Sequence, residues 1–309
     1  MRRRSPIRNL AEYLLALAAV KSLEWTPLPV AHGLARAYAR LLDTVVPRWR
    51  RAAKQNLALA LPELTEAEHR DIIDGVFGSL ARLLVTFAKF PSIGPNNIHR
   101  WIRPEGYEHF EAAHRAGHGV LFATAHLGNW ELSAYAHPWF AAPMNVVVRP
   151  LDNPLIDRFV ERRRARSGNR SFSKRDSARA ILKALAANQA VGILIDQNVL
   201  ADSGTFVDFF GVPAAAATGL SKIAARSGAA VIPGFALWSE SERRYVLRLY
   251  PPIPITGDAT HDTQAIQSQL EAVVRAHPEQ WLWIHRRWKT RPSGSPPLYE
   301  CTPVGRNVL

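Results

Sequence analysis

The chain has 309 residues, of which 47% are hydrophobic, and its formal net charge is +13. This length and apolar content supply a sizeable core and exclude a disordered protein. The single cysteine, Cys301, excludes an intramolecular disulfide and cysteine-based zinc sites, and the eleven histidines show no metal-ligand spacing, so we expect no metal. The basic excess favours an anionic partner, namely nucleic acid, acidic lipid headgroups or an acidic carrier protein.

The first fifty residues alternate apolar runs with basic side chains. The apolar run 10–20 contains Glu12, lacks a clear cleavage site and is shorter than the roughly 20 residues that a membrane span requires. The next run, 28–46, is interrupted by charged side chains such as Arg36 and Arg40. This pattern is typical of helices that lie in the interface of an anionic membrane, although packed helices with a solvated basic face would also show it.

Three helices are predicted before the second half of the chain. Segments 52–60 and 65–90 have apolar residues at helical spacing, and Thr65 with Glu68 forms a capping-box pattern at the start of the second segment. A further helix follows Glu105 and ends near residue 117. Their apolar faces are most simply explained by packing against a core.

The most informative stretch covers residues 120–134. It begins with a short apolar strand, continues through a turn that contains Gly128 and Asn129, and then begins a helix. His126 lies at this junction, and Glu131 follows five residues later. Strand-to-helix junctions of α/β folds expose side chains at the carboxyl edge of the sheet, so we expect a functional site there.

The His126 and Glu131 side chains suit the activation of a hydroxyl group. An imidazole with a pKa of about 6.5 accepts a proton at neutral pH, and a neighbouring carboxylate determines which ring nitrogen carries the hydrogen. We therefore predict that His126 is a general base and that Glu131 orients it and stabilises its protonated form. The same spacing also occurs by chance, so a pair without a catalytic role is the alternative.

The segment 126–131, His-Leu-Gly-Asn-Trp-Glu, resembles the first sequence block of the bacterial lipid A late acyltransferases, a branch of the glycerolipid acyltransferase group. The wider group has Asp at the last position of this block, and Glu is the variant typical of the lipid A branch. The resemblance continues over most of the chain. It implies an α/β fold in which helices flank a mixed, largely parallel central sheet, with a helical N-terminal segment that associates with a membrane.

Two other predicted strands end in polar residues. Arg149 follows one strand, and Asp196 and Gln197 follow the strand 191–195. A cation at this edge can bind phosphate or stabilise an oxyanion, although a surface arginine is the simpler interpretation of Arg149. The resemblance assigns Arg149 to the block that holds the acceptor's phosphate. We also expect Asn129 and Gln197 to contact substrate and Asp196 to bind sugar hydroxyls, with a turn cap as the alternative for Asp196.

Several remaining segments carry weaker signals. The basic run 158–175 is predicted either to contact a phosphorylated acceptor or acidic carrier, or to be a solvated face. We expect an aromatic loop over 204–213, followed by a helix of small residues that begins at Ala214. Segment 278–289 resembles the family's C-terminal signature, and its Trp and basic side chains suit a membrane interface.

The resemblance implies a complete reaction. A fatty acyl chain passes from a thioester on acyl carrier protein, or from acyl-CoA, to a hydroxyl of a phosphorylated glycolipid, most simply a lipid A precursor, without a cofactor. The enzyme is expected on the cytoplasmic face of a bacterial inner membrane, in peripheral or monotopic attachment. The expected organisation is a helical membrane-associating segment over 1–50, an acyltransferase domain over 51–292 and a loose tail over 293–309.

Three alternatives stay open at this point. The acceptor can be another glycolipid such as a phosphatidylinositol mannoside, whose enzymes share the His-x-Gly-Asn-Trp core but usually carry Asp where this chain has Glu131. A basic nucleic-acid-binding protein is permitted by charge, but no helix-turn-helix, zinc or RNA-recognition signature is present, so nucleic acid is not the expected partner. A catalytically silent relative that binds membranes is disfavoured by the intact pair of His126 and Glu131.

Overall fold

The computed structural model describes residues 5–173 and 177–299. The last two residues of the basic run, Lys174 and Arg175, and residues 300–309 of the tail lie outside the described residues. The helices are α1 (Pro6–Trp25), α2 (Leu28–Val45), α3 (Pro47–Ala60), α4 (Glu66–Lys89), α5 (Tyr107–Arg115), α6 (Trp130–Phe140), α7 (Pro154–Arg164), α8 (Ser177–Ala186), α9 (Gly219–Ser227) and α10 (Ala259–Ala276). The strands are β1 (Ile102–Glu105), β2 (Val120–Thr124), β3 (Asn145–Val148), β4 (Arg170–Ser173), β5 (Ala190–Leu194), β6 (Thr205–Phe209), β7 (Val212–Ala216), β8 (Ala230–Ser239) and β9 (Arg244–Leu249).

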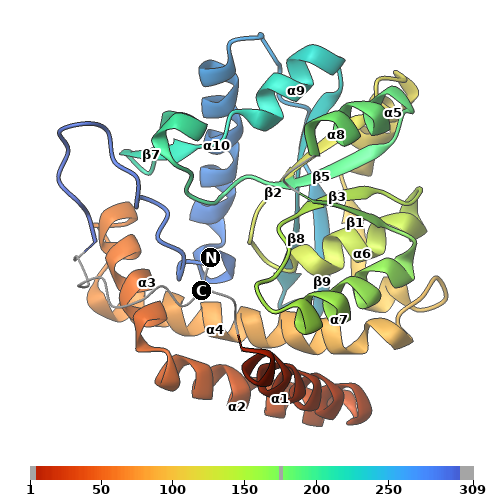
Figure 1. Ribbon diagram of the computed structural model, residues 1–309, viewed down its shortest axis with the longest axis vertical. Helices are drawn as coiled ribbons and strands as arrows, with labels where there is room; N and C mark the ends of the chain where they lie inside the picture. The colour runs from red at the N-terminus through yellow and green to blue at the C-terminus, as the bar shows by residue number, and fades with distance from the viewer. Residues whose placement is uncertain (1–4, 174–176, 300–309) are drawn as a thin grey trace.

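A seven-stranded sheet in the order β1-β9-β8-β2-β5-β3-β4 forms the centre of the molecule (Figure 1). Strands β8, β2, β5, β3 and β4 are parallel to one another. Strands β1 and β9 are parallel to each other, and β9 is antiparallel to β8, so this pair runs in the opposite direction. The α/β class with a mixed, largely parallel sheet and flanking helices is therefore confirmed.

Helices cover both faces of the sheet, and the side chains of β2 alternate between them. Val120 and Phe122 are buried with the residues of α5 and α6, whereas Leu121 and Ala123 are buried with those of α8 and α9. Burial on both faces explains why this strand is a continuous apolar run in the sequence.

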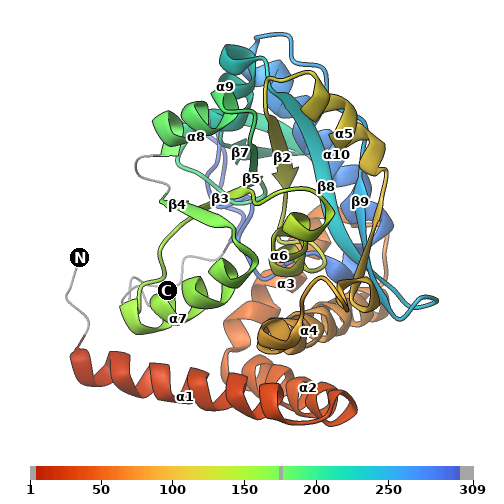
Figure 2. The same cartoon turned by 90° about the vertical axis from the view of Figure 1, so that its right-hand side faces the viewer.

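Helices α1 to α4 form a further layer, which lies at the end of the sheet where β2 terminates (Figures 1 and 2). The predicted capping box at the start of α4 is confirmed, because Thr65 Oγ1 accepts from the backbone N–H of Glu68 while the Glu68 carboxylate accepts from that of Thr65. Among the described residues, no helix combines the length and the apolar character needed to cross a membrane.

Two sequence-based expectations differ from the structure. Segment 204–216 contains the antiparallel hairpin β6–β7 instead of a loop and the start of a helix. Its two-residue turn, Phe210–Gly211, has positive φ at both positions, as hairpin turns of this type require. Pairing with β6 overrides the helix preference of the alanines of β7, and the helix begins only at Gly219.

The tryptophans of the C-terminal signature also differ from expectation. Trp281, Trp283 and Trp288 are all fully buried, and they pack in the same core as helices α2 to α4. They are therefore structural residues and not a membrane-interface belt. Their segment instead supports the turn that carries His126.

Candidate active site

The turn between β2 and α6 is fixed from two sides. From the C-terminal segment, the carbonyl of Gln280 accepts from Gly128 N at 2.9 Å, and Leu282 N donates to the carbonyl of His126 at 3.0 Å. From β8, the carbonyl of Ala236 accepts from Asn129 N at 2.8 Å. Gly128 has φ of 62°, and a Cβ there would lie 2.0 Å from the Ala236 oxygen. Only glycine therefore fits the turn.

The side chain that contacts the imidazole is Asp196. It follows β5, the parallel neighbour of β2, so the two residues meet at the carboxyl edge of the sheet. Asp196 Oδ1 lies 2.9 Å from His126 Nδ1, and Oδ2 accepts from the backbone N–H of His126 at 2.9 Å and from Trp281 Nε1 at 3.0 Å. Because a carboxylate only accepts, Nδ1 carries the hydrogen and Nε2 has the free lone pair.

Burial and neighbouring charge shift the pKa values of His126 and Asp196 in opposite directions. Burial alone would lower the pKa of His126, but the charge and hydrogen bond of Asp196, followed by the charge of Glu131, outweigh it and raise that pKa above its ordinary value. Burial likewise opposes ionisation of Asp196, but His126 and the donated hydrogen bonds hold the pKa of that carboxyl well below its usual range. Asp196 is therefore ionised, and its negative charge polarises the imidazole of His126.

Glu131 is held by a different partner from the one expected. It lies in the first turn of α6, and its carboxylate accepts two hydrogen bonds from the guanidinium of Arg164 in α7, at 2.6 and 2.9 Å. Arg164 also donates to Glu161 at 2.8 Å. The orienting hydrogen bond on His126 thus comes from Asp196, while Glu131 acts on the imidazole through its charge.

A cavity of about 750 Å³ opens beside His126. Its polar lining includes Glu131, Arg149, Arg164 and Gln197. Its apolar lining comes from the sheet, from α6 and from the segment that leads into β3, and several of these side chains belong to the core beneath α5 and α6: Phe122, Tyr135, Met144, Val146, Leu247 and Leu249. One cavity therefore has a polar region at the imidazole and an apolar region beside it.

The other expected substrate contacts divide into two groups. Arg149 and Gln197 line the cavity, and the Arg149 side chain is 79% exposed, with Nη2 3.8 Å from Asp152. Asn129 is fully buried and caps α6, because its Oδ1 accepts from Leu132 N at 3.0 Å. Asp196 is buried, both of its oxygens accept hydrogen bonds from His126 or Trp281, and it is not among the residues that line the cavity.

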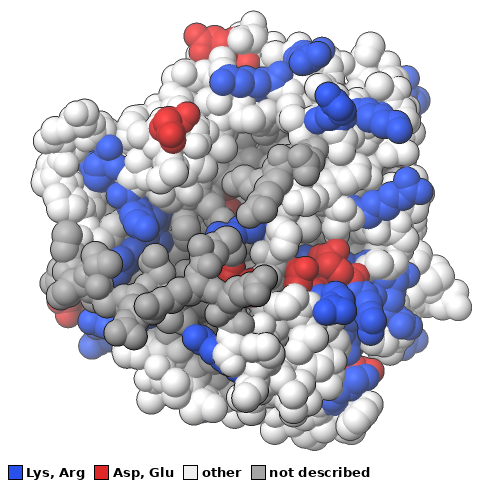
Figure 3. Space-filling view, viewed as in Figure 1, with Lys and Arg blue, Asp and Glu red and all other residues white. Residues whose placement is uncertain are grey.

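The described part of the basic run also divides by environment. Arg163 is buried, donates to the carbonyls of Phe87 and Ala88, and pairs with Glu24 of α1. The exposed members are Arg158, Arg162, Arg166 and Arg170. Figure 3 shows basic side chains, together with a few carboxylates, gathered on this face over α7.

Comparison with known proteins gives one consistent result. The family model of the bacterial lipid A biosynthesis acyltransferases matches residues 2–290. The chain is 31% identical over 276 residues to the lipid A biosynthesis lauroyltransferase of Escherichia coli (strain K12), covering 88% of this chain and 90% of that protein. It is similar to the palmitoleoyltransferase of the same organism at 29% identity, covering 88% and 89%, and to its myristoyltransferase at 25%, covering 91% and 87%.

Proposed function

Because the chain belongs to the bacterial lipid A biosynthesis acyltransferase family and is an acyltransferase, we propose that it moves a fatty acyl chain from a carrier thioester to a hydroxyl of a lipid A precursor. The observation that carries this proposal is the hydrogen-bonded pair of His126 and Asp196 at the edge of a cavity that has a polar and an apolar region.

In the proposed reaction, Nε2 of His126 removes the proton of the acceptor hydroxyl. The hydroxyl oxygen bonds to the thioester carbonyl carbon, the carbon–sulfur bond breaks, and the thiolate takes the proton from His126. Asp196 keeps Nδ1 protonated and stabilises the imidazolium. Base assistance of this kind contributes roughly 10²- to 10⁴-fold in rate.

In the proposal, Asp196 orients His126 and Glu131 contributes only its charge. Its charge stabilises the imidazolium through space, and its two hydrogen bonds with Arg164 keep the carboxylate in place at the cavity wall. Arg164 also prevents the mostly buried carboxylate of Glu131 from remaining an unpaired charge. Glu131 is thus a positioned electrostatic partner of His126.

Binding of the acceptor is assigned to the exposed arginines at the cavity mouth. Arg149 lines the cavity and has most of its side chain exposed, so it is available to bind a phosphate of the glycolipid. Exposed Arg158, Arg162 and Arg166 lie on α7 or directly after it, where they suit either further phosphates or an acidic acyl carrier protein. The overall charge of +13 supports an anionic donor carrier.

Membrane attachment is assigned to the outer faces of α1 and α2. Most of the exposed large hydrophobic residues in the described chain lie here: Ile7, Leu10, Leu14, Leu15, Trp25, Leu28, Val30, Leu41, Leu42 and Val45. Glu12 of α1 also lines the catalytic cavity, and Asn153 beside the mouth donates to the Asn9 carbonyl at 2.9 Å. An apolar surface beside the cavity mouth suits an enzyme that takes a lipid from a bilayer of a bacterial inner membrane.

The direct test offers the purified protein four substrate pairs. Labelled acyl-carrier thioester or acyl-CoA is combined with a lipid A precursor or a phosphatidylinositol mannoside, and the products are identified by mass spectrometry. We expect transfer of the acyl chain from the carrier thioester to the lipid A precursor. Transfer only to the mannoside would reject the acceptor, and salt-dependent DNA binding without any acyl transfer would favour the nucleic-acid alternative.

A separate test addresses the membrane. Leu15→Glu and Val45→Glu place charges on the outer faces of α1 and α2, and they should weaken flotation with anionic vesicles at least several-fold. The matched control is Leu200→Glu, because Leu200 is 68% exposed but lies outside these helices. Equal flotation of all three variants would reject this surface.

A further inference from the structure

A second cavity of about 310 Å³ lies between the N-terminal helices and the β8–β9 hairpin. Its lining comes from α2, from α4, from the segment before β1 and from the hairpin, and it includes Leu28, Arg82, Arg100, Arg243, Arg244 and Tyr245. It shares none of these residues with the catalytic cavity. It is therefore a separate site.

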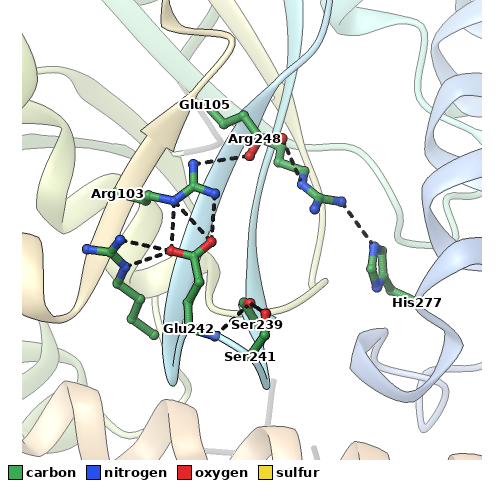
Figure 4. A network of polar contacts seen from close by, with 8 residues as sticks. Arg103, Glu105, Ser239, Ser241, Glu242, Arg248 and His277 are labelled. Atoms are coloured by element: carbon green, nitrogen blue, oxygen red, sulfur yellow. Dashed lines mark hydrogen bonds and ion pairs between the residues drawn. The ribbon is translucent and has the colours of Figure 1, made fainter.

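Positive side chains outnumber negative ones around the second cavity. Four arginines line it, whereas the carboxylates beside it are Glu240 and Glu242 of the hairpin. Glu242 accepts from Arg103 at 2.6 to 3.1 Å and from Arg244 at 2.8 and 2.9 Å. Figure 4 shows Glu242 and Arg103 pointing toward each other. Glu242 is shared between Arg103 and Arg244, so the two carboxylates do not balance the four lining arginines and positive charge is in excess.

Several donors in this cavity are free to take a ligand. The Nε of Arg82 is buried without a hydrogen-bond partner among the described residues, whereas the buried Tyr245 hydroxyl lies beside Arg82, Thr86 and Asn129. Arg100 and Arg243 are exposed at the rim. Buried polar groups of native proteins almost always have partners, so the unpaired Nε of Arg82, together with the exposed guanidinium groups of Arg100 and Arg243, is available to an acceptor in the cavity.

The anion nearest to these donors comes from the chain itself. Glu240 is 71% exposed, its oxygens lie 3.8 Å from Arg82 and 3.9 Å from Arg243, and it accepts from Trp238 Nε1 at 2.8 Å. A phosphate with several oxygens would bind these groups more completely than the loosely placed carboxylate. The lowered pKa of half-buried His32 agrees with a positive site, because burial and then the charges of Arg36, Arg82 and Arg243 lower it.

The rim of the cavity is apolar on the side of α2. Leu28 lines the cavity and is 41% exposed, and Trp25 at the end of α1 is 76% exposed. Figure 2 shows the β8–β9 hairpin projecting on the side of the molecule where α1 and α2 meet. We propose that this cavity binds the phosphate of an anionic phospholipid that is not the acylated substrate, with the lipid chains lying against Trp25 and Leu28. A free phosphate would use the arginines but not the apolar rim.

The test compares lipid, free phosphate and neutral lipid on the full chain. The probes are dihexanoyl phosphatidylglycerol below its micelle concentration, inorganic phosphate, and phosphatidylglycerol or phosphatidylcholine vesicles. Arg100→Glu/Arg243→Glu should weaken binding of the short lipid and of phosphatidylglycerol vesicles about tenfold or more. The charge-matched control, Lys222→Glu/Arg226→Glu on exposed sites of α9, should change binding less than twofold.

Two variants probe the donors without reversing charge on the arginines. Tyr245→Phe should weaken binding of the short lipid several-fold, and thermal unfolding measures the cost of removing a hydroxyl that lies beside Arg82, Thr86 and Asn129. Glu240→Gln should tighten binding several-fold by removing the competing carboxylate, whereas Glu111→Gln on exposed α5 should not. Acyl transfer between detergent-dispersed substrates should be unchanged in the arginine and glutamate variants, which separates this proposal from the catalytic one.

Three outcomes would overturn the inference. One is equal weakening in the two double variants, which would mean diffuse attraction by surface charge. Another is equally tight binding of inorganic phosphate and short lipid, which would make the site one for a free anion. The last is loss of acyl transfer between dispersed substrates in Arg100→Glu/Arg243→Glu, which would make the cavity part of the substrate site.

Discussion

His126 Nδ1 and Asp196 Oδ1 lie 2.9 Å apart at the ends of two adjacent parallel strands, although 70 residues separate them in the sequence. The contact occupies Nδ1, so Nε2 is the nitrogen that accepts the proton in the proposed reaction. It also explains why Asp196 is buried, since both of its oxygens accept hydrogen bonds from the catalytic turn or from Trp281.

Replacing Asp196 with Asn tests this contact. An amide cannot stabilise the imidazolium by charge, and its NH₂ group can donate to Nδ1 and so favour the wrong tautomer. We expect kcat/KM for acyl transfer to fall by about 10² or more. Circular dichroism of the same sample controls for folding, and a folded variant with a rate within threefold of wild type would refute the role.

The ion pair between Glu131 and Arg164 allows a double-mutant cycle. Arg164→Gln leaves the mostly buried carboxylate of Glu131 unpaired, so it should cost about 1–3 kcal/mol of folding free energy. Glu131→Gln/Arg164→Gln should regain much of that stability but keep low activity, because the charge that acts on His126 is absent. Recovery of both stability and activity would show that Glu131 serves only to pair Arg164.

The pH profile should show the electrostatic effect on His126. A general base works only when neutral, so the rate falls as the pH drops through the raised pKa of His126. Glu131→Gln removes one charge that raises this pKa, and the acidic limb should therefore move to lower pH. A profile of kcat/KM against pH measures the shift, and a limb that stays in place or moves to higher pH contradicts the assignment.

Gly128→Ala tests how tightly the catalytic turn is held. The added Cβ would meet the Ala236 carbonyl at 2.0 Å, and φ of 62° is unfavourable for alanine, so we expect a loss of about 2 kcal/mol or more in denaturant unfolding. Gly219→Ala is the matched control, because nothing lies within 4 Å of its Cβ position. The control should be close to neutral, and equal losses in both variants would discount the clash.

The parts of the fold that were predictable are those with local signals. The apolar run before His126, the Gly128–Asn129 turn and the Thr65 cap are each determined by neighbours in sequence, and the structure has all three. The hairpin at Phe210–Gly211 was missed because alanine favours helices in isolation, while pairing across the hairpin decides its conformation here.

The contacts of the candidate site depend on which strands become neighbours. Because Asp196 follows a predicted strand, the sequence indicates that it reaches the same sheet edge as His126. The sequence does not show that β5 lies directly beside β2. The Arg164–Glu131 pair likewise needs the packing of α7 against α6. A tryptophan suits a buried core as well as a membrane interface, so the sequence alone does not show that Trp281 is buried against Asp196.

The most direct test of the account is the rate of acyl transfer by His126→Ala, measured in single turnover with labelled acyl-carrier thioester and lipid A precursor. Wild type and Gly219→Ala serve as the active references. The account predicts a loss of about 10²- to 10⁴-fold in a variant that remains folded. Undiminished transfer by His126→Ala would contradict the assignment of His126 as the base.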